Sequence, residues 1–378
     1  MRKIKKIVSL AATIALVGSL AGCGSSNSSG SSGTSEGGDT STSSGEKPYV
    51  AVVSKGFQHQ FWQVVKKGAD QAAADLGVTI TFEGPASESD INDQVNMINS
   101  ALSKKPSALA LAALDTQAVS SQLAEAQKQG IPVVGFDSGV PGAPEGQVAA
   151  NAATDNYNAA TIPADKLLEV ETIVEKIKGA TAASPVAIGV VSQDATSASL
   201  IDRTKGFIDR AFEKCEELVG AGNVEVVGHD SYNKKATGEA IVKIVVNVPP
   251  TTSATDVQNS AQAVLATENL IAIYGSNQGG VDGILAASND GSDFNKENGK
   301  YKDIVAVGFD SGKGQKTAVE KGWFLGSVTQ DPYQIGYQAV ALAVKAMNGE
   351  EVSDVDTGAK WYDQSNFNDE DINQLLYD

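Results

Sequence analysis

The hexapeptide VGFDSG occurs twice in this chain of 378 residues, at positions 134–139 and again at 307–312. Each copy starts in an apolar, β-branched run typical of a buried strand, and each places an aspartate, Asp137 or Asp310, directly after that run. Six identical residues in matching surroundings predict two similar halves, each presenting a carboxylate at the end of a strand. The alternative is a coincidental turn motif, because Asp and Gly favour turns for local reasons.

Strand-like and helix-like patterns alternate outward from both copies of the hexapeptide, which predicts parallel strands joined by crossover helices. We therefore expect an α/β fold of two doubly wound parallel-sheet lobes. Ligands of such sheets bind outside the carboxyl ends of the strands, so facing lobes would form a cleft lined by both aspartates. The expected strands are 49–53, 78–82, 108–111 and 133–136 in the first half, and 186–191, 224–227, 271–274 and 305–309 in the second.

Two segments of the second half are harder to assign. The periodicity predicts one long helix through Leu168 and Ile177. Residues 233–255 contain a β-branched run at 241–248 followed by two prolines, which fits either a strand or an inserted loop.

Length and composition limit the classes of protein. A chain of 378 residues with 41% hydrophobic and 20% charged residues suffices for two domains with their own cores. Its net charge of −17 argues against binding to nucleic acid, because phosphate backbones are repelled. Cys23 and Cys215 are the two cysteines, so we expect neither a zinc cluster nor a disulfide framework.

The N-terminus has the pattern of an export signal. Basic residues precede an apolar run at 7–20, which is shorter than the ~20 residues of a spanning helix. The end of the expected signal, residues 1–22, resembles the lipobox of bacterial lipoproteins, which implies cleavage before Cys23 and a lipid on its thiol. The alternative is an ordinary signal with an incidental cysteine. Residues 23–47 are rich in Ser and Gly and predict a flexible tether.

The lipoprotein-like start, the two α/β halves and several spaced motifs resemble the ribose-binding type of sugar-binding protein that serves bacterial ABC transporters. The resemblance covers about residues 48–355 and implies a type I periplasmic binding fold. Its lobes would be 48–153 with 331–355 and 154–330 with 356–378, joined by a three-strand hinge. It also implies a monomer without cofactor, held on the extracytoplasmic face of the membrane, that delivers its ligand to a permease.

The same resemblance implies an aromatic platform in the first lobe. His59, Phe61 and Trp62 occupy the place where the family has a polar residue and an aromatic pair that sandwiches a sugar ring. Phe61 also lies on the apolar stripe of the following helix, so it could belong to the core instead. Because adjacent residues cannot both face one side of a helix, we favour the platform.

The remaining contacts that the resemblance implies come from five strand ends. Ser138 follows Asp137 where the ribose-binding member has an arginine, which puts ribose itself in doubt. For the aromatic contact of the second lobe, Tyr232 fits by local pattern, whereas counting back from Asn277 leads to a position near Thr251. The implied set is Asp137, Ser138, Arg203, Tyr232, Asn277, Asp310 and Gln330.

These residue types suit a neutral monosaccharide or a related polyol. Asp and Asn accept or share hydroxyl hydrogens, Arg and His donate, and aromatic rings cover the weakly polar faces of a sugar. An anion would be repelled by the two aspartates, whereas a ligand that bears an amine stays open. Asp115 and Asp194 also follow strands, but we interpret both as helix N-caps.

Other functions are less well supported by the sequence. His59 and His229 are the two histidines, and no catalytic triad is evident, although Asp137 and Asp310 could form a glycosidase pair. A sugar-responsive repressor would need a helix-turn-helix where the signal and tether lie. A partner that delivers a sugar or furanone signal to a receptor has the same residues as a transport protein, and the identity of the sugar stays open.

Overall fold

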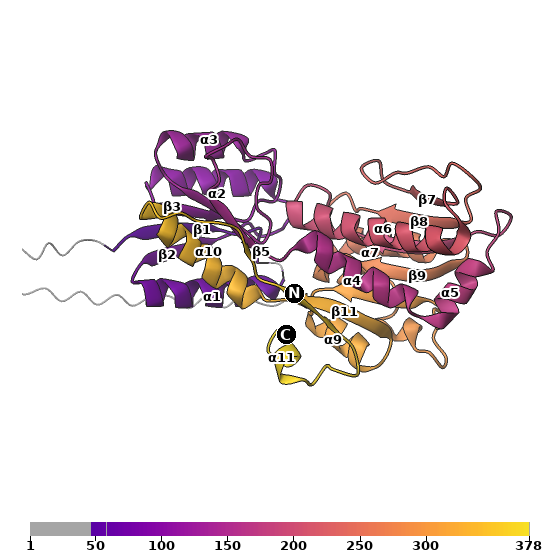
Figure 1. Ribbon diagram of the computed structural model, residues 1–378. Coiled ribbons are helices and arrows are strands. Elements are labelled where there is room, and N and C mark those ends of the chain that lie inside the picture. Colours follow the sequence, from indigo (N-terminus) through magenta and orange to yellow (C-terminus); the bar gives the residue numbers. More distant parts are fainter. Residues whose placement is uncertain (1–46, 58, 378) are drawn as a thin grey trace, which may run out of the picture. The chain divides into compact units, whose positions relative to one another are not determined.

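The computed structural model describes residues 47–57 and 59–377 as two α/β lobes (Figure 1). The predicted signal peptide and Cys23 lie outside these residues. Within the described ranges, no helix combines the length and apolar character needed to cross a bilayer.

The first lobe is built on a six-stranded, all-parallel sheet in the order β12-β5-β4-β3-β1-β2. Buried side chains of β1, β3 and β4 point alternately to α1 and α10 on one face and to α2 and α3 on the other, as two separate core clusters show. The elements are β1 (Tyr49–Val53), α1 (Phe61–Leu76), β2 (Thr79–Glu83), α2 (Ile91–Ser103), β3 (Ala108–Leu111), α3 (Ser120–Lys128), β4 (Val133–Phe136), β5 (Ala150–Ala153), α10 (Pro332–Met347) and β12 (Val355–Asp356).

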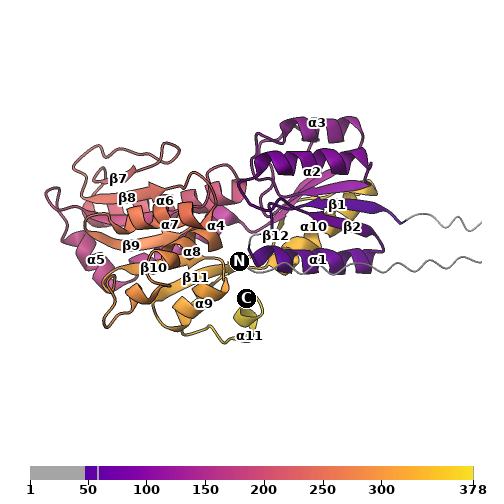
Figure 2. The same cartoon turned by 180° about the vertical axis from the view of Figure 1, so that it is seen from behind.

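The second lobe contains a seven-stranded sheet in the order β13-β11-β10-β9-β6-β8-β7, parallel except for β13 at one edge. Helices α4, α5 and α6 cover one face, and α7, α8 and α9 cover the other (Figure 2). The elements are α4 (Asn156–Leu168), α5 (Glu171–Lys178), β6 (Val186–Val191), α6 (Ala198–Val219), β7 (Val224–Val227), β8 (Val242–Asn247), α7 (Ala254–Leu265), β9 (Leu270–Gly275), α8 (Gln278–Ala286), the 3-10 turn Ser292–Phe294, β10 (Val305–Phe309), α9 (Lys313–Glu320), β11 (Phe324–Gln330), β13 (Ala359–Tyr362) and α11 (Glu370–Asn373).

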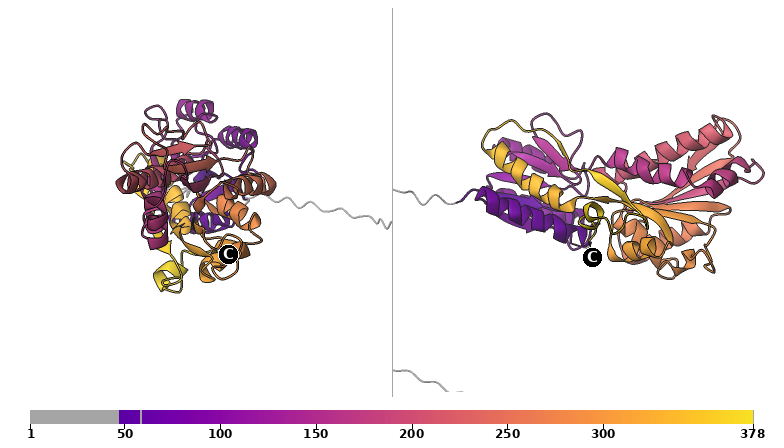
Figure 3. Two further views of the ribbon diagram at one scale, coloured as in Figure 1. Left: turned by 90° about the vertical axis from the view of Figure 1, so that its right-hand side faces the viewer. Right: turned by 60° about the horizontal axis from the view of Figure 1, so that its bottom comes forward.

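Helices α1 and α10 pack at very short range although they are far apart in the sequence (Figure 3). A β-carbon on Gly68 would lie 2.0 Å from the Tyr333 carbonyl oxygen, and one on Gly336 would lie 1.9 Å from that of Val65. These two glycines therefore allow the contact. It ties the segment after β11 to the first lobe.

The chain passes between the two sheets three times, at residues 154–155, at 331 and at 357–358. The last passage follows β12, about two residues beyond the boundary expected at 355–356. Hydrogen bonds link the passages, since Thr154 Oγ1 donates to the Gly358 carbonyl at 3.0 Å and the Asp155 amide donates to Asp356 Oδ1 at 3.1 Å. The structure thus has the three-strand hinge that the sequence predicted.

The fold class is confirmed, but one predicted element was wrong. The long helix through Leu168 and Ile177 is two helices, α4 and α5, separated because Val170 adopts an extended conformation. No glycine or proline marks this break, so the hydrophobic periodicity of the sequence continues across it and predicted a single helix.

The ambiguous segment at 233–255 contains a strand. Residues 242–247 form β8, which lies between β6 and β7 in the sheet. The two prolines follow β8, so they remove no hydrogen-bond donor from the sheet. Strand β7 is consequently pushed to the edge.

Candidate functional site

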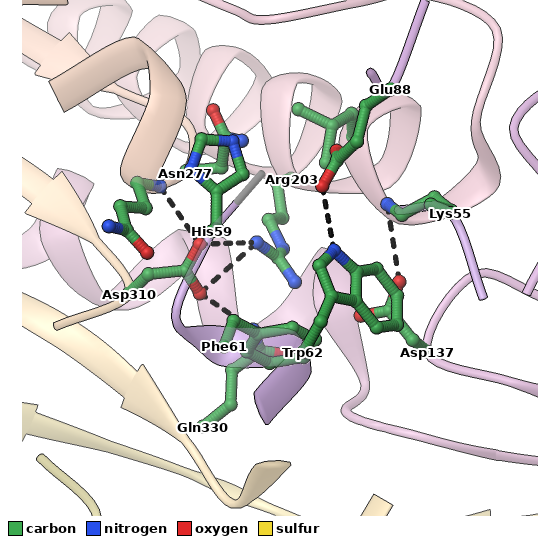
Figure 4. A pocket seen from close by; sticks show the side chains of 12 residues that line it. Lys55, His59, Phe61, Trp62, Glu88, Asp137, Arg203, Asn277, Asp310 and Gln330 are labelled. Carbon is green, nitrogen blue, oxygen red and sulfur yellow. Dashed lines mark hydrogen bonds and ion pairs between the residues drawn. The ribbon is translucent and has the colours of Figure 1, made fainter. Parts of the chain in front are cut away.

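A small cavity lies where the carboxyl ends of strands from both sheets meet (Figure 4). First-lobe residues line one side and second-lobe residues the other. The lining residues are Lys55, His59, Phe61, Trp62, Glu88, Asp137, Leu200, Arg203, Asn277, Gln278, Asp310 and Gln330. Eight of the ten ligand-contact residues implied by the resemblance therefore line this one cavity.

The repeated hexapeptide gives both aspartates the same unusual backbone. Asp137 follows β4 with a φ angle of 53°, and Asp310 follows β10 with a φ angle of 75°. Asp is among the few non-glycine residues that visit this left-handed region, because its short polar side chain can bond locally. Each carboxylate turns from its strand end into the cavity.

In the first lobe, Asp137 forms a buried ion pair with Lys55. The Lys55 Nζ lies 3.2 Å from Asp137 Oδ2, and it also donates to Ser199 Oγ of the second lobe at 3.1 Å. Burial alone would lower the pKa of Lys55, but Asp137, Glu88 and Asp194 outweigh it and raise that pKa. Burial raises the pKa of Asp137 despite the opposing charges of Lys55 and Arg203.

A third carboxylate, Glu88, fixes the indole of Trp62. Trp62 Nε1 donates to Glu88 Oε1 at 2.7 Å, and Gln193 Nε2 donates to the other oxygen at 2.8 Å. Burial alone would raise the pKa of Glu88, but the charges of His59 and Lys55 and these two hydrogen bonds lower it. Glu88 is thus ionised at neutral pH.

In the second lobe, Asp310 is surrounded by donors. Arg203 Nη1 lies 3.3 Å from Asp310 Oδ2, and the backbone N–H of Gln278 donates to the same oxygen at 2.9 Å. Gln330 Nε2 donates to Asp310 Oδ1 at 2.6 Å. Arg203 is itself held by Asn156, whose Oδ1 accepts from Nε at 2.7 Å, and by the ring of Phe309, 4.1 Å from Cζ. The second lobe therefore offers a rigid polar wall.

Phe61 and Trp62 both border the cavity, with their rings edge to face at 5.0 Å between centroids. The argument that adjacent residues cannot share one side of a helix was wrong at this position. These residues open α1, and the cavity meets the start of the helix rather than its flank. Phe61 also packs in the first-lobe core, so its two interpretations are compatible.

Two amide oxygens in the cavity wall have no hydrogen-bond partner among the described residues. They are the buried Oε1 atoms of Gln278 and Gln330. A buried acceptor without a donor costs about 1 to 3 kcal/mol. Both atoms therefore suit a ligand that carries several hydroxyl donors.

Ser138 and Tyr232 are not on the cavity wall. Ser138 is buried beside it, and its Oγ accepts a hydrogen bond from the Ser199 amide at 3.2 Å, so it contributes to the contact between the lobes. Tyr232 lies between β7 and β8 and packs on the second-lobe core. Because β8 takes the place beside β6, the segment after β8 approaches the first lobe, where Thr252 Oγ1 lies 3.1 Å from Ser87 Oγ.

The prediction that Asp115 and Asp194 are helix N-caps was wrong, because Val119 is the N-cap of α3 and Ser197 is that of α6. Both aspartates instead stabilise the turn before their helix. Asp115 Oδ1 accepts hydrogen bonds from the amides of Gln117 and Ala118, and Asp194 Oδ1 accepts from those of Thr196 and Ser197. In the described part of the chain, no group of His, Cys, Asp and Glu side chains is arranged to hold a metal ion.

The chain matches the periplasmic binding protein domain over residues 50–351. It belongs to this family. Among periplasmic binding proteins it is 26% identical over 323 residues to the D-allose-binding periplasmic protein of Escherichia coli K12, covering 84% of this chain and 90% of that protein. The family predicted from the sequence is confirmed.

Two solved structures have the same fold as this chain. A protein from Brachyspira murdochii described as an ABC transporter, LacI family transcriptional regulator is 39% identical, with a TM-score of 0.72 over 88% of this chain and 99% of that one. An ABC transporter solute-binding protein from Agrobacterium vitis with bound D-fucose is 29% identical, with a TM-score of 0.69 over 87% of this chain and 100% of that one.

Four wall residues were missed in the sequence: Lys55, Glu88, Leu200 and Gln278. Lys55 comes two residues after a largely buried strand, at the end of the sheet where ligands of such folds bind, so its position alone could have identified it. Glu88 lies in the loop between β2 and α2, where an acidic residue is normally solvated. Only its buried partners distinguish it.

Proposed function

We propose that this protein binds one neutral monosaccharide or a related polyol between its lobes and delivers it to an ABC transporter permease. The observation that carries the proposal is the composition of the cavity wall. Two aromatic rings enter from the first lobe, and each lobe supplies its own buried acid–base pair, Lys55–Asp137 and Arg203–Asp310. Aromatic faces beside hydroxyl-binding groups match the two kinds of surface of a sugar ring.

The charge of the wall supports an uncharged ligand. With His59 counted as neutral, Lys55 and Arg203 stand against Glu88, Asp137 and Asp310, so the wall has one excess negative charge. A sugar phosphate would add further negative charge, while Lys55 and Arg203 are already paired with aspartates, which is costly in a buried site.

The related proteins support the same ligand class. The Escherichia coli relative is described as binding D-allose, and the Agrobacterium vitis structure contains D-fucose. Both ligands are neutral monosaccharides. We propose that Asp137, Asp310, Arg203, Asn277 and Gln330 bind hydroxyls while Phe61 and Trp62 cover a face of the ring, with His59 at the edge.

We further propose that binding occurs without turnover. The family is one of sugar-binding transport proteins, and both candidate acids are engaged in ion pairs with a basic side chain. Burial raises the pKa of the Cys215 thiol to about 12, which keeps it from acting as a nucleophile. Incubation with sugars and aryl glycosides should leave both unchanged, and product formation would contradict the proposal.

Members of this family act outside the cytoplasm, and we propose that this protein is a monomer held there by a lipid on Cys23. The proposal rests on the sequence of the N-terminal 23 residues. Mass spectrometry of the membrane-extracted protein should show diacylglycerol on Cys23, and Cys23→Ser should release the protein. An unmodified cysteine would contradict the anchor without affecting the ligand proposal.

A thermal-shift screen of the mature protein tests the ligand class. The panel contains neutral aldoses, ketoses and polyols with the phosphates of the same sugars. A ligand at a hundredfold excess over Kd stabilises the native state by about 2.7 kcal/mol, which is a clear rise in melting temperature. Stabilisation by a phosphate but by none of the neutral compounds would overturn the proposal.

A further inference from the structure

Gln193 follows β6 and is 1% exposed, yet it is not on the cavity wall. All the polar atoms of its side chain are engaged. Its Oε1 accepts from Asn277 Nδ2 at 2.8 Å and lies 3.2 Å from His59 Nε2, and its Nε2 donates to Glu88 Oε2 at 2.8 Å. Asn277 belongs to the second lobe, whereas His59 and Glu88 belong to the first.

We infer that Gln193 is a positioning residue that aligns the ligand-binding groups of the two lobes when the cleft is closed. Its three partners all line the cavity. Through Glu88 it also reaches the platform, because the other oxygen of that carboxylate holds Trp62 Nε1 at 2.7 Å. The inference rests on the proposed function, since it concerns the same cavity.

Other hydrogen bonds between the lobes join fewer wall residues. The bond from Lys55 Nζ to Ser199 Oγ at 3.1 Å involves one wall residue, Lys55. Thr196 Oγ1 donates to the Leu114 carbonyl at 3.0 Å, and Ser87 Oγ meets Thr252 Oγ1 at 3.1 Å. Neither pair touches the cavity wall. The Gln193 amide is therefore distinguished by joining three wall residues through one buried group.

The position requires an amide in particular. An apolar side chain would leave three buried polar groups without this partner, each at a cost. A carboxylate could still accept from Asn277 and His59, but it would face the ionised Glu88 at hydrogen-bond distance with no proton between them. Like charges this close disfavour joint ionisation, so one of the two carboxyls would have to take up a proton.

The test uses this difference. The charged and titratable groups around the position are Glu88, Lys55, His59 and Asp194, with Asp282 of α8 near His59. Because some of them titrate in the wild type too, the quantity to compare is the ratio of the Kd of Gln193→Glu to that of the wild type at each pH. The ligand is the neutral sugar that binds best in the thermal-shift panel.

We expect this ratio to be about tenfold or more at pH 8 and to fall toward one at pH 5, with the loss mainly in the dissociation rate. The double variant Glu88→Gln/Gln193→Glu exchanges donor and acceptor. It should recover most of the affinity at pH 8, because the introduced amide can donate to the introduced carboxylate. Gln122→Glu is the matched control, since Gln122 Nε2 donates to Asn99 Oδ1 within the first lobe, and its ratio should stay flat.

A Gln193→Glu ratio near one at pH 8, or a ratio equally high at pH 5, would overturn the inference. If Gln193→Glu does not fold at pH 8, the double variant and Gln193→Met decide. The double variant must bind the sugar with nearly wild-type affinity at pH 8, and Gln193→Met must bind it about tenfold more weakly than the wild type at both pH values. If either variant behaves otherwise, the inference is contradicted. A wild type that binds no neutral sugar would instead overturn the proposed function.

Discussion

The two lobes present the same hexapeptide and the same aspartate, but they surround it differently. Asp310 receives Arg203, Gln330 and a backbone amide, so both of its oxygens have donors. Asp137 pairs with Lys55, and its Oδ2 accepts no well-formed hydrogen bond from the described residues. Burial accordingly raises the pKa of Asp137.

This difference shows what a local motif determines and what it leaves to the rest of the fold. VGFDSG sets the backbone angle and the position of each carboxylate at a strand end. The partners come from other elements: Arg203 from α6 and Gln330 from β11, but Lys55 from the end of β1. The second lobe is therefore a preorganised polar wall, whereas the first combines a platform with a more adjustable ion pair.

Arg203→Met should have the largest effect. The substitution removes the positive charge that pairs with the buried Asp310 carboxylate. Breaking such a buried ion pair typically lowers the free energy of unfolding by about 3 to 5 kcal/mol. Sugar affinity should fall at least about a hundredfold, or roughly 2.7 kcal/mol. Chemical unfolding and calorimetry measure the two effects. Arg210→Met, which removes a more exposed ion pair on the same helix, is the control.

Lys55→Met should cost less stability than Arg203→Met, because burial raises the pKa of Asp137 even beside Lys55, so the carboxyl that is left behind is readily neutralised. Equal losses in the two variants would contradict the distinction between a rigid and an adjustable pair.

The aspartates themselves give the next effect. Asp137→Ala and Asp310→Ala should each weaken sugar binding tenfold or more, about 1.4 kcal/mol. Asp310→Ala should lower the stability of the ligand-free protein more, since it strands Arg203 and Gln330 together. Calorimetry and thermal unfolding test both statements. Wild-type affinity in either variant would remove that residue from the site.

The contribution of Glu88 to stability should depend on pH. The pKa of Glu88 is lowered from its usual value of 4.5, so its ionised form stabilises the fold above that value. This contribution disappears as the pH falls through the lowered pKa. Glu88→Gln should therefore lower the melting temperature at pH 7, by the equivalent of about 1.5 kcal/mol, and progressively less below pH 4.5.

Glu83→Gln on β2, where the side chain is partly exposed beside Lys104, serves as the control and should change little. A melting-temperature loss in Glu88→Gln that is as large at pH 3 as at pH 7 would show that the charge of Glu88 is not responsible.

The smallest predicted effect concerns the connection between the lobes. Tyr377 packs in the first-lobe core 6.2 Å from the Phe61 ring, while its hydroxyl lies 3.4 Å from the Ser311 amide of the second lobe. Tyr377→Ala should weaken sugar binding a few-fold by loosening the platform, and Tyr377→Phe less. Tyr333→Ala, at an exposed tyrosine, is the control. Titration of Trp fluorescence with the sugar measures the affinity of all three variants. Wild-type affinity in Tyr377→Ala would contradict a role of Tyr377 in connecting the lobes.

Much of the fold was predictable because its signals are local and regular. Buried strands such as β3, β4 and β10 carry uninterrupted apolar runs, and the repeated hexapeptide marks equivalent strand ends. The break between α4 and α5 was not predictable, because Val170 has no special backbone chemistry. The place of β8 in the sheet was also hidden, since strand order depends on long-range pairing.

Site residues that belong to a sequence motif could be predicted, whereas those whose role depends on packing in the folded protein could not. Phe61, Trp62, Asp137, Arg203 and Asp310 all belong to short patterns and line the cavity. Glu88 is an ordinary surface residue type in the sequence, and Gln193 is marked there only by its place after a strand. Both become significant because they are buried where the two lobes meet. Tyr232 matched a local pattern, but β8 takes the place beside β6, and Tyr232 is not on the wall.

The central claim is that both lobes grip one neutral sugar. Isothermal titration calorimetry of the mature protein against the sugars and their phosphates tests it most directly. We predict saturable one-to-one binding of at least one neutral monosaccharide, no binding of its phosphate, and a loss of at least tenfold in both Asp137→Ala and Asp310→Ala. Absence of binding across the neutral sugars, or binding that survives the loss of either aspartate, would contradict the account.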